Sequence, residues 1–123
     1  MKIKSFIVII IMSSMMLFGC GNEQDKVVIS YCKSLEAGKY DEAVSYLSKS
    51  AKQVLENSGG KPSLAAASDV FKQRKGIKKI KISKREVNGV MATIKFVYHF
   101  NDGSTAEDFF PLVREDGKWK ISM

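Results

Sequence analysis

The sequence is poor in the residue types that build metal centres and disulfide scaffolds. Its 123 residues include two cysteines, one histidine and two prolines. So few cysteines exclude a disulfide-dense fold, and one histidine with so few thiols cannot supply a familiar zinc or iron site. A phosphate-binding loop is also absent, since residues 57–61 lack the upstream glycine and no Ser or Thr follows Lys61. We therefore expect no metal and no cofactor.

What remains is an ordinary globular composition with an excess of positive charge. Hydrophobic residues make up 45% of the chain and charged residues 27%, and the formal net charge is +7. A chain of this length has room for one ordinary domain. Its average composition excludes a wholly disordered chain.

The first twenty residues have the layout of a secretory signal. Lys2 and Lys4 precede an uncharged stretch over residues 5–18, which ends at the small residue Gly19 and at Cys20. As a helix, this stretch would reach roughly 21 Å, short of the roughly 30 Å of a bilayer core. Export is thus favoured over a permanent transmembrane helix.

Residues 17–20, Leu-Phe-Gly-Cys, resemble the lipobox of bacterial lipoproteins. The resemblance implies that the thiol of Cys20 is alkylated with diacylglycerol and that the peptide bond between Gly19 and Cys20 is then cut. Residues 1–19 would be the signal peptide and residues 20–24 a lipidated tether to a domain over residues 25–123. The protein would be held by lipid on the exported face of the plasma or outer membrane. An ordinary cleaved signal and an uncleaved anchor are the alternatives.

The first half of the remaining chain has helical periodicity. Apolar residues recur every three or four positions after residue 22, after Asp41 and over residues 63–75. Gly38 is placed to end the first of these helices. Ser50 and Gln53 have the spacing of a capping box within the second. Cys32 has the helical spacing of a small buried thiol.

From Ile77 the period changes to two, and turn signals at 88–89, 101–103 and 116–117 divide the rest into four antiparallel strands. A three-residue first turn that pairs Glu86 with Val90 would put Ile80 and Ile82 on the core side. A two-residue turn at 116–117 would pair Leu112 with Ile121 and bring Trp119 into the same layer. On the second strand, the expected core face consists of Val90, Ala92, Ile94, Phe96, Tyr98 and Phe100.

Helices followed by an antiparallel sheet predict an α+β domain with the N-terminal helices packed on one face of a four-stranded sheet. Residues 34–43, 98–103 and 112–121 resemble small bacterial lipoproteins of the nuclear-transport-factor-2-like (NTF2-like, or cystatin-like) superfamily. The resemblance covers residues 25–123 and implies a curved sheet that encloses a conical cavity with the helices. Many such lipoproteins have no assigned activity. Enzymes of the superfamily place an Asp, or a His–Asp pair, inside the cone.

Few residues are candidates for catalysis. Asp108 shares strand parity with Ala106 and Phe110, so it is the one acidic candidate for the cone. The single histidine, His99, has the opposite parity and is expected to face away from the cavity.

Two surfaces are candidates for interaction. Eight cations crowd residues 72–85, where they either guard an edge strand in solvent or face anionic lipid head groups beside the tether. Nucleic acid is disfavoured, because no aromatic residues interleave them. An outer sheet face with apolar residues would suit a homodimer or another partner. The basic set is Lys72, Arg74, Lys75, Lys78, Lys79, Lys81, Lys84 and Arg85, and the outer-face set is Met91, Val97, His99, Phe109 and Val113.

The sequence favours a lipid-anchored, non-catalytic binding or accessory module of the cell envelope, with a small apolar ligand or an envelope protein as its partner. The alternative from another class is an isomerase or dehydratase that uses Asp108. A third hypothesis is a structural envelope protein whose cone is filled by its own side chains.

Replacing Cys20 with Ser tests the anchor. The hydroxyl of serine cannot accept the diacylglycerol group in place of a thiolate. Cys20→Ser should therefore leave the membrane fraction, or accumulate as unprocessed precursor, when cell fractions are compared by immunoblot. Normal processing together with unchanged membrane partition would contradict the lipoprotein interpretation.

Overall fold

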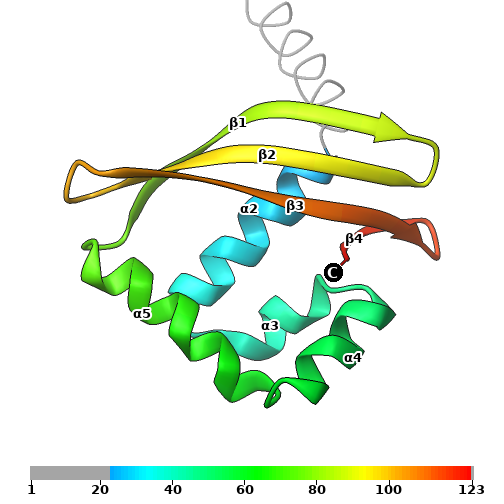
Figure 1. The fold of residues 1–123 in the computed structure, drawn as a ribbon, viewed down its shortest axis with the longest axis horizontal. Helices are drawn as coiled ribbons and strands as arrows, with labels where there is room; N and C mark the ends of the chain where they lie inside the picture. Colours follow the sequence, from blue (N-terminus) through cyan, green and yellow to red (C-terminus); the bar gives the residue numbers. More distant parts are fainter. Residues whose placement is uncertain (1–22, 123) are drawn as a thin grey trace, which may run out of the picture.

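A computed structural model of the chain describes residues 23–122. Helices occupy the first half of this region and strands the second, in the order expected from the periodicity (Figure 1). The helices are α2 (Glu23–Glu36), α3 (Tyr40–Ser45), α4 (Lys49–Asn57), the short 3₁₀-helix η1 (Lys61–Leu64) and α5 (Ala65–Gln73). The strands are β1 (Ile77–Asn88), β2 (Met91–Phe100), β3 (Thr105–Glu115) and β4 (Lys118–Ile121).

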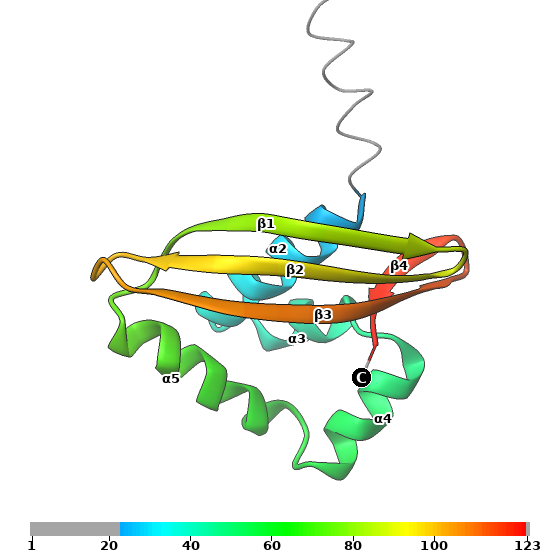
Figure 2. The same ribbon diagram turned by 45° about the horizontal axis from the view of Figure 1, so that its top comes forward.

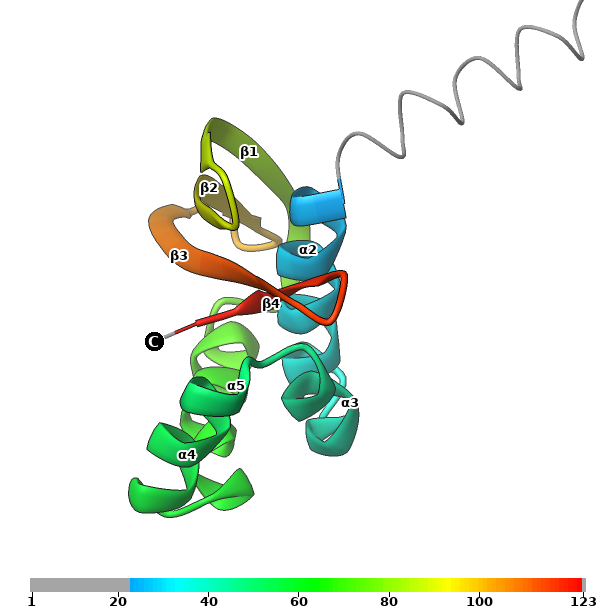
Figure 3. The same ribbon diagram turned by 90° about the vertical axis from the view of Figure 1, so that its right-hand side faces the viewer.

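The strands form one antiparallel sheet in the order β1-β2-β3-β4. The sheet bends along its length, and the helices all lie on one side of it (Figures 2 and 3). This is the predicted α+β architecture. Each turn of the meander joins neighbouring strands, so the fold needs no crossover connection.

Helix α2 lies along the inner side of the sheet and is tied to β1 at both ends. Near its start, Arg85 of β1 donates two hydrogen bonds to the carboxylate of Asp25, at 2.8 and 2.6 Å. At its end, the carboxylate of Glu36 accepts the backbone N–H of Ile77 at 2.5 Å. Gly38 then ends the helix with φ +74°, as predicted, because its left-handed conformation closes a Schellman motif. The two ties fix the direction of α2 relative to the strand.

The predicted second helix is broken into α3 and α4. Leu47 and Ser48 leave the helix between them, because Leu47 bridges to Ile121 and the N–H of Ser48 bonds the carbonyl of Ile121 at 2.8 Å. The Ser48 hydroxyl then accepts the N–H of Ala51 at 3.1 Å and caps α4. The capping box predicted at Ser50 and Gln53 is therefore wrong. Contact with the last strand decided this boundary.

In the first hairpin, Ile80 and Ile82 face the core as expected, but the turn differs from the predicted one. Asn88 pairs with Met91, so the loop is Gly89-Val90, with Gly89 at φ +62°, and Glu86 lies opposite Thr93 rather than Val90. The extra residue sits inside the strand, as a β-bulge between Ile82 and Lys84. Beyond the bulge, Ile82 lies opposite Phe96 and Ile80 opposite Tyr98, both toward the core. The predicted three-residue turn is wrong, but the isoleucines face inward.

The core lies between the helices and the inner face of the sheet, and α2 and β2 contribute the most residues to it. The predicted inner-face residues of β2 are buried except Val90, which is 59% exposed because it belongs to the turn. At the last hairpin, Leu112 pairs with Ile121 and Trp119 is buried, both as predicted. Asp116 and Gly117 both have positive φ, as a two-residue type I′ turn requires.

The α4 cap provides a test of the corrected boundary. Ser48→Ala removes the side-chain acceptor of an otherwise unpaired helix N–H and should lower the free energy of unfolding by about 1 kcal/mol. Ser50→Ala leaves the cap bond in place and should change it much less. Urea unfolding followed by circular dichroism measures both, and a larger loss for Ser50→Ala would restore the rejected capping box.

Candidate functional site

The interior of the cone is occupied by aromatic side chains of the protein itself. The ring of Tyr31 from α2 meets Phe110 edge to face at 5.5 Å between centroids, and Phe110 lies 5.3 Å from Phe96. Phe96 in turn meets Tyr98 edge to face at 5.1 Å. Continuous ring contacts of this kind leave no room for a ligand along the axis of the cone.

A thiol and two phenols are buried in this interior, and burial keeps them protonated. The Sγ of Cys32 lies 3.4 Å from the Oη of Tyr98. Desolvation raises the pKa of Cys32 to about 12, although the hydrogen bond to Tyr98 opposes the shift. Desolvation likewise raises the pKa of Tyr31 to about 12 and raises that of Tyr98. None of them is a nucleophile or a base at neutral pH.

Asp108 lies at an inner-face register position but at the margin of the cone. It pairs with Phe96 across β2 and β3, yet its side chain is exposed. Its Oδ1 accepts the backbone N–H of Phe109 at 2.8 Å. The parity assigned from the sequence is confirmed, whereas the apolar enclosure that would tune a catalytic carboxylate is missing.

Asp108 lines a cleft between α5 and the inner face of the sheet, of about 260 Å³, which we call the α5 cleft. Its floor is apolar and its rim is charged. Arg74 stands at one end, with its guanidinium 5.1 Å from the ring centroid of Phe100 and 3.2 Å from the hydroxyl of Ser104. The lining residues are Ala67, Val70, Phe71, Arg74, Tyr98, Phe100, Ala106, Glu107 and Asp108.

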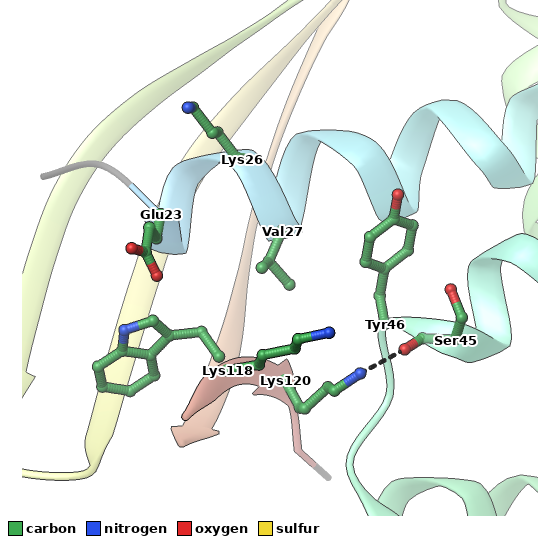
Figure 4. Close-up of a pocket in the computed structure, with 8 residues that line it drawn as sticks. Glu23, Lys26, Val27, Ser45, Tyr46, Lys118 and Lys120 are labelled. Atoms are coloured by element: carbon green, nitrogen blue, oxygen red, sulfur yellow. Dashed lines mark hydrogen bonds between the residues drawn. The ribbon is translucent and has the colours of Figure 1, made fainter. Parts of the chain in front are cut away.

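A second hollow, of about 430 Å³, lies where the first turns of α2 pass β4, and we call it the α2–β4 cavity. Val27 points into it, and the ring of Tyr46 and the side chains of Lys118 and Lys120 border it (Figure 4). Lys120 donates to the carbonyl oxygen of Ser45 at 2.8 Å. Sequence reasoning missed this cavity, because three distant segments form it and no motif marks any of them.

The predicted outer-face residues do come together. Met91, Val97 and His99 share the outer face of β2, because they are separated by even numbers of positions. On β3, Val113 lies opposite Met91 and Phe109 opposite Lys95, so both are on the same face. His99 faces away from the core, as expected. Met91 and Phe109 are the well-exposed members of the set, and the other three are half-buried.

The eight predicted basic residues do not form one surface. Lys79, Lys81 and Lys84 pair with outer-face residues of β2 and project from the outer face. The bulge turns Arg85 to the inner face, where it binds Asp25. The remaining cations lie at the end of α5, in the link to β1 and at the start of β1, near the last turn of α2. They are Lys72, Arg74, Lys75 and Lys78.

Gly19 and Cys20, the predicted cleavage and lipidation residues, lie outside the residues that the structure describes. Among residues 23–122, no helix is long and apolar enough to span a bilayer. The same region contains no group of three or more Cys, His, Asp or Glu side chains arranged to hold a metal ion.

Comparison with known proteins places the chain in a family. A family model described as a domain of unknown function, DUF4878, matches residues 18–122. The chain belongs to the DUF4878 family. No curated protein matches this DUF4878 chain significantly.

Solved structures show that the DUF4878 domain has an NTF2-like fold. A Campylobacter jejuni protein provisionally named an NTF2-like transpeptidase has a TM-score of 0.71 at 20% identity, over 81% of this chain and 97% of that one. A de novo designed NTF2-fold protein, NT-9, has a TM-score of 0.56 at 17% identity, over 83% of each chain. At these identities the likeness concerns the fold alone.

The buried thiol gives a direct test of the closed interior. In a Cys20→Ser protein, Cys32 should not react with a maleimide at pH 8, because the thiol is inaccessible and its raised pKa leaves almost no thiolate. The same protein in denaturing urea should react quickly and completely. Labelling followed by mass spectrometry measures both, and rapid native labelling would mean that the cone is open.

Proposed function

We propose that this DUF4878 protein is exported, is held at a membrane by lipid on Cys20, and acts there as a non-catalytic binding module for a small apolar molecule. The observation that carries the binding role is the α5 cleft, whose floor is apolar and lies outside the filled cone. Concave apolar sites with a few polar groups at the rim are the usual form of small-molecule sites. The lipobox-like residues 17–20 support the anchor.

The chemistry of the described residues supports binding rather than catalysis. Covalent catalysis needs a nucleophile beside a base, and Cys32, the thiol within residues 23–122, is buried against Tyr98 and protonated. The provisional transpeptidase name of the Campylobacter jejuni protein is therefore not matched by a reactive thiol within residues 23–122.

An isomerase or dehydratase mechanism would rest on Asp108. A base of that kind works when apolar walls desolvate its carboxylate. Asp108 is instead exposed to solvent and bonded to the N–H of Phe109. Its place at the rim of the α5 cleft suits it better to contact a polar end of a bound molecule than to abstract a proton.

The shape of the α5 cleft gives a test with a matched control. Val70, in the cleft, and Val54, on α4 outside it, are 47% and 44% exposed. Val70→Glu puts a carboxylate against the apolar floor, and Val54→Glu adds the same charge elsewhere. We expect Val70→Glu to weaken binding of the fluorescent apolar probe anilinonaphthalene sulfonate by about tenfold, since desolvating a carboxylate costs at least the corresponding 1.4 kcal/mol. Val54→Glu should bind like the unchanged protein.

Native mass spectrometry of the detergent-extracted protein tests the same proposal without a chosen probe. It reports the mass of the acyl group on Cys20, the oligomeric state and any small molecule that remains bound. Probe binding that is equal in both valine variants, together with no retained molecule, would contradict a ligand site in the cleft. Loss of the acyl mass alone would contradict only the anchor.

A further inference from the structure

The β1–β2 turn carries a cluster of uncovered apolar side chains. Six large apolar residues within 23–122 are well exposed, and three of them are neighbours at this turn. Val87 is 53% exposed, and Val90 and Met91 are each 59% exposed. We call these three residues the hairpin tip. Val87 has an inner-face position and Met91 an outer-face position, so the exposed apolar side chains surround the end of the hairpin instead of forming a patch on one face. Such an arrangement suits an apolar phase that the turn can enter.

The tip is uncovered because β1 and β2 extend past the helical layer. Asp25, in the first turn of α2, reaches β1 at Arg85, and Asn88 at the end of β1 lies about 10 Å farther along the strand. Val87 has an inner-face position, opposite buried Ala92, yet no helix packs on it. Its exposure therefore follows from the length of the strand.

The chain that precedes α2 brings the predicted anchor to this same end. Three peptide units separate Cys20 from Glu23, the first residue of α2, so the two Cα atoms lie within about 11 Å of each other. The pair between Asp25 and Arg85 fixes the first turn of α2 against the part of β1 that leads to the tip (Figures 1 and 2). A bilayer that holds an acyl chain on Cys20 is therefore the apolar phase nearest to the hairpin tip.

The residues beside the tip suit the surface of a bilayer. The N–H of Arg114 bonds the carbonyl of Val90 at 2.8 Å, and the guanidinium of this exposed residue lies 6.0 Å from the ring centroid of Trp119. Lys118, also exposed, is the first residue of β4, directly after the neighbouring β3–β4 turn. Acidic residues lie there too, namely Glu86, Glu115 and Asp116. The apolar side chains of the tip match the acyl boundary, and Arg114 and Lys118 match the phosphates of the head groups.

We propose that the hairpin tip inserts into the head-group region of the bilayer that holds the lipid on Cys20 and makes a second contact there. This inference rests on the lipid anchor proposed above. One acylated residue on a short tether leaves the orientation of the domain free. A second contact at the tip fixes the orientation, with the β1–β2 turn toward the membrane.

The test attaches an environment-sensitive nitrobenzoxadiazole label to Val90→Cys in the full-length, acylated protein. The protein is reconstituted into vesicles of phosphatidylethanolamine and phosphatidylglycerol, with and without lipids that carry a nitroxide on the head group. Acylation occupies Cys20 and burial protects Cys32, so the label reports the introduced thiol. Val54→Cys on α4, which lies outside the α5 cleft, is the matched control, and Met91→Cys serves if Val90→Cys does not fold.

Emission shifted to the blue and quenched by the nitroxide lipids at the tip, with neither change at Val54→Cys, is the expected result. Equal emission and equal quenching at the two positions, in protein that still sediments with the vesicles, would overturn tip insertion and leave the anchor intact. A tip label that is blue-shifted but not quenched would mean that a protein surface covers the tip, which also overturns it. Protein that lacks the acyl mass and stays in the supernatant would overturn both proposals.

Discussion

The packing of α2 along the inner face of the sheet is the constraint on which the rest of the structure depends. Two carboxylates at opposite ends of this helix, Asp25 and Glu36, bind β1 at Arg85 and at the N–H of Ile77. Between them, Tyr31 and Cys32 enter the aromatic row of the sheet. The large apolar area buried there supplies the driving force, whereas the two polar ties set the position and direction of the helix. The α2–β4 cavity takes its place from that position.

Filling the cone has a consequence for the chemistry available to the domain. An NTF2-like fold with an open cone can bury a carboxylate among apolar walls and so tune it for catalysis. Here aromatic rings occupy that volume, and two of the polar groups that remain inside, Cys32 and Tyr98, are bonded to each other. Charged groups are left at the margins, where solvent reaches them. The fold alone does not indicate a reaction.

The sequence predicted those features that depend on local pattern. Alternation along β2, the two-residue turn at Asp116 and Gly117 and the glycine stop at Gly38 are each decided within a few residues, and each was confirmed. Tertiary contacts decided the features that were missed. Ser48 leaves the helix because Ile121 forms a β-bridge with Leu47 and its carbonyl accepts the N–H of Ser48.

The bulge at Ser83 is a second case, and it bears on the candidate sites. Simple alternation from Ile80 and Ile82 puts Arg85 on the outer face with the lysines. The extra residue reverses the parity beyond Ile82 and turns Arg85 inward to Asp25. The α2–β4 cavity was missed for a related reason, since α2, the segment after α3 and β4 meet only once the helices are packed.

The length of α2 separates the two ends of the domain and gives each a different role. Fourteen residues of helix span about 21 Å, from the first turn beside Arg85 to the last turn beside Ile77. The tether and the hairpin tip belong to the first end, whereas Arg74 and Phe100 of the α5 cleft belong to the second. With Cys20 acylated and the tip in the head groups, this second end of the domain would lie away from the bilayer. A ligand would then be taken from the aqueous side of the envelope, which is consistent with the charged rim of the cleft.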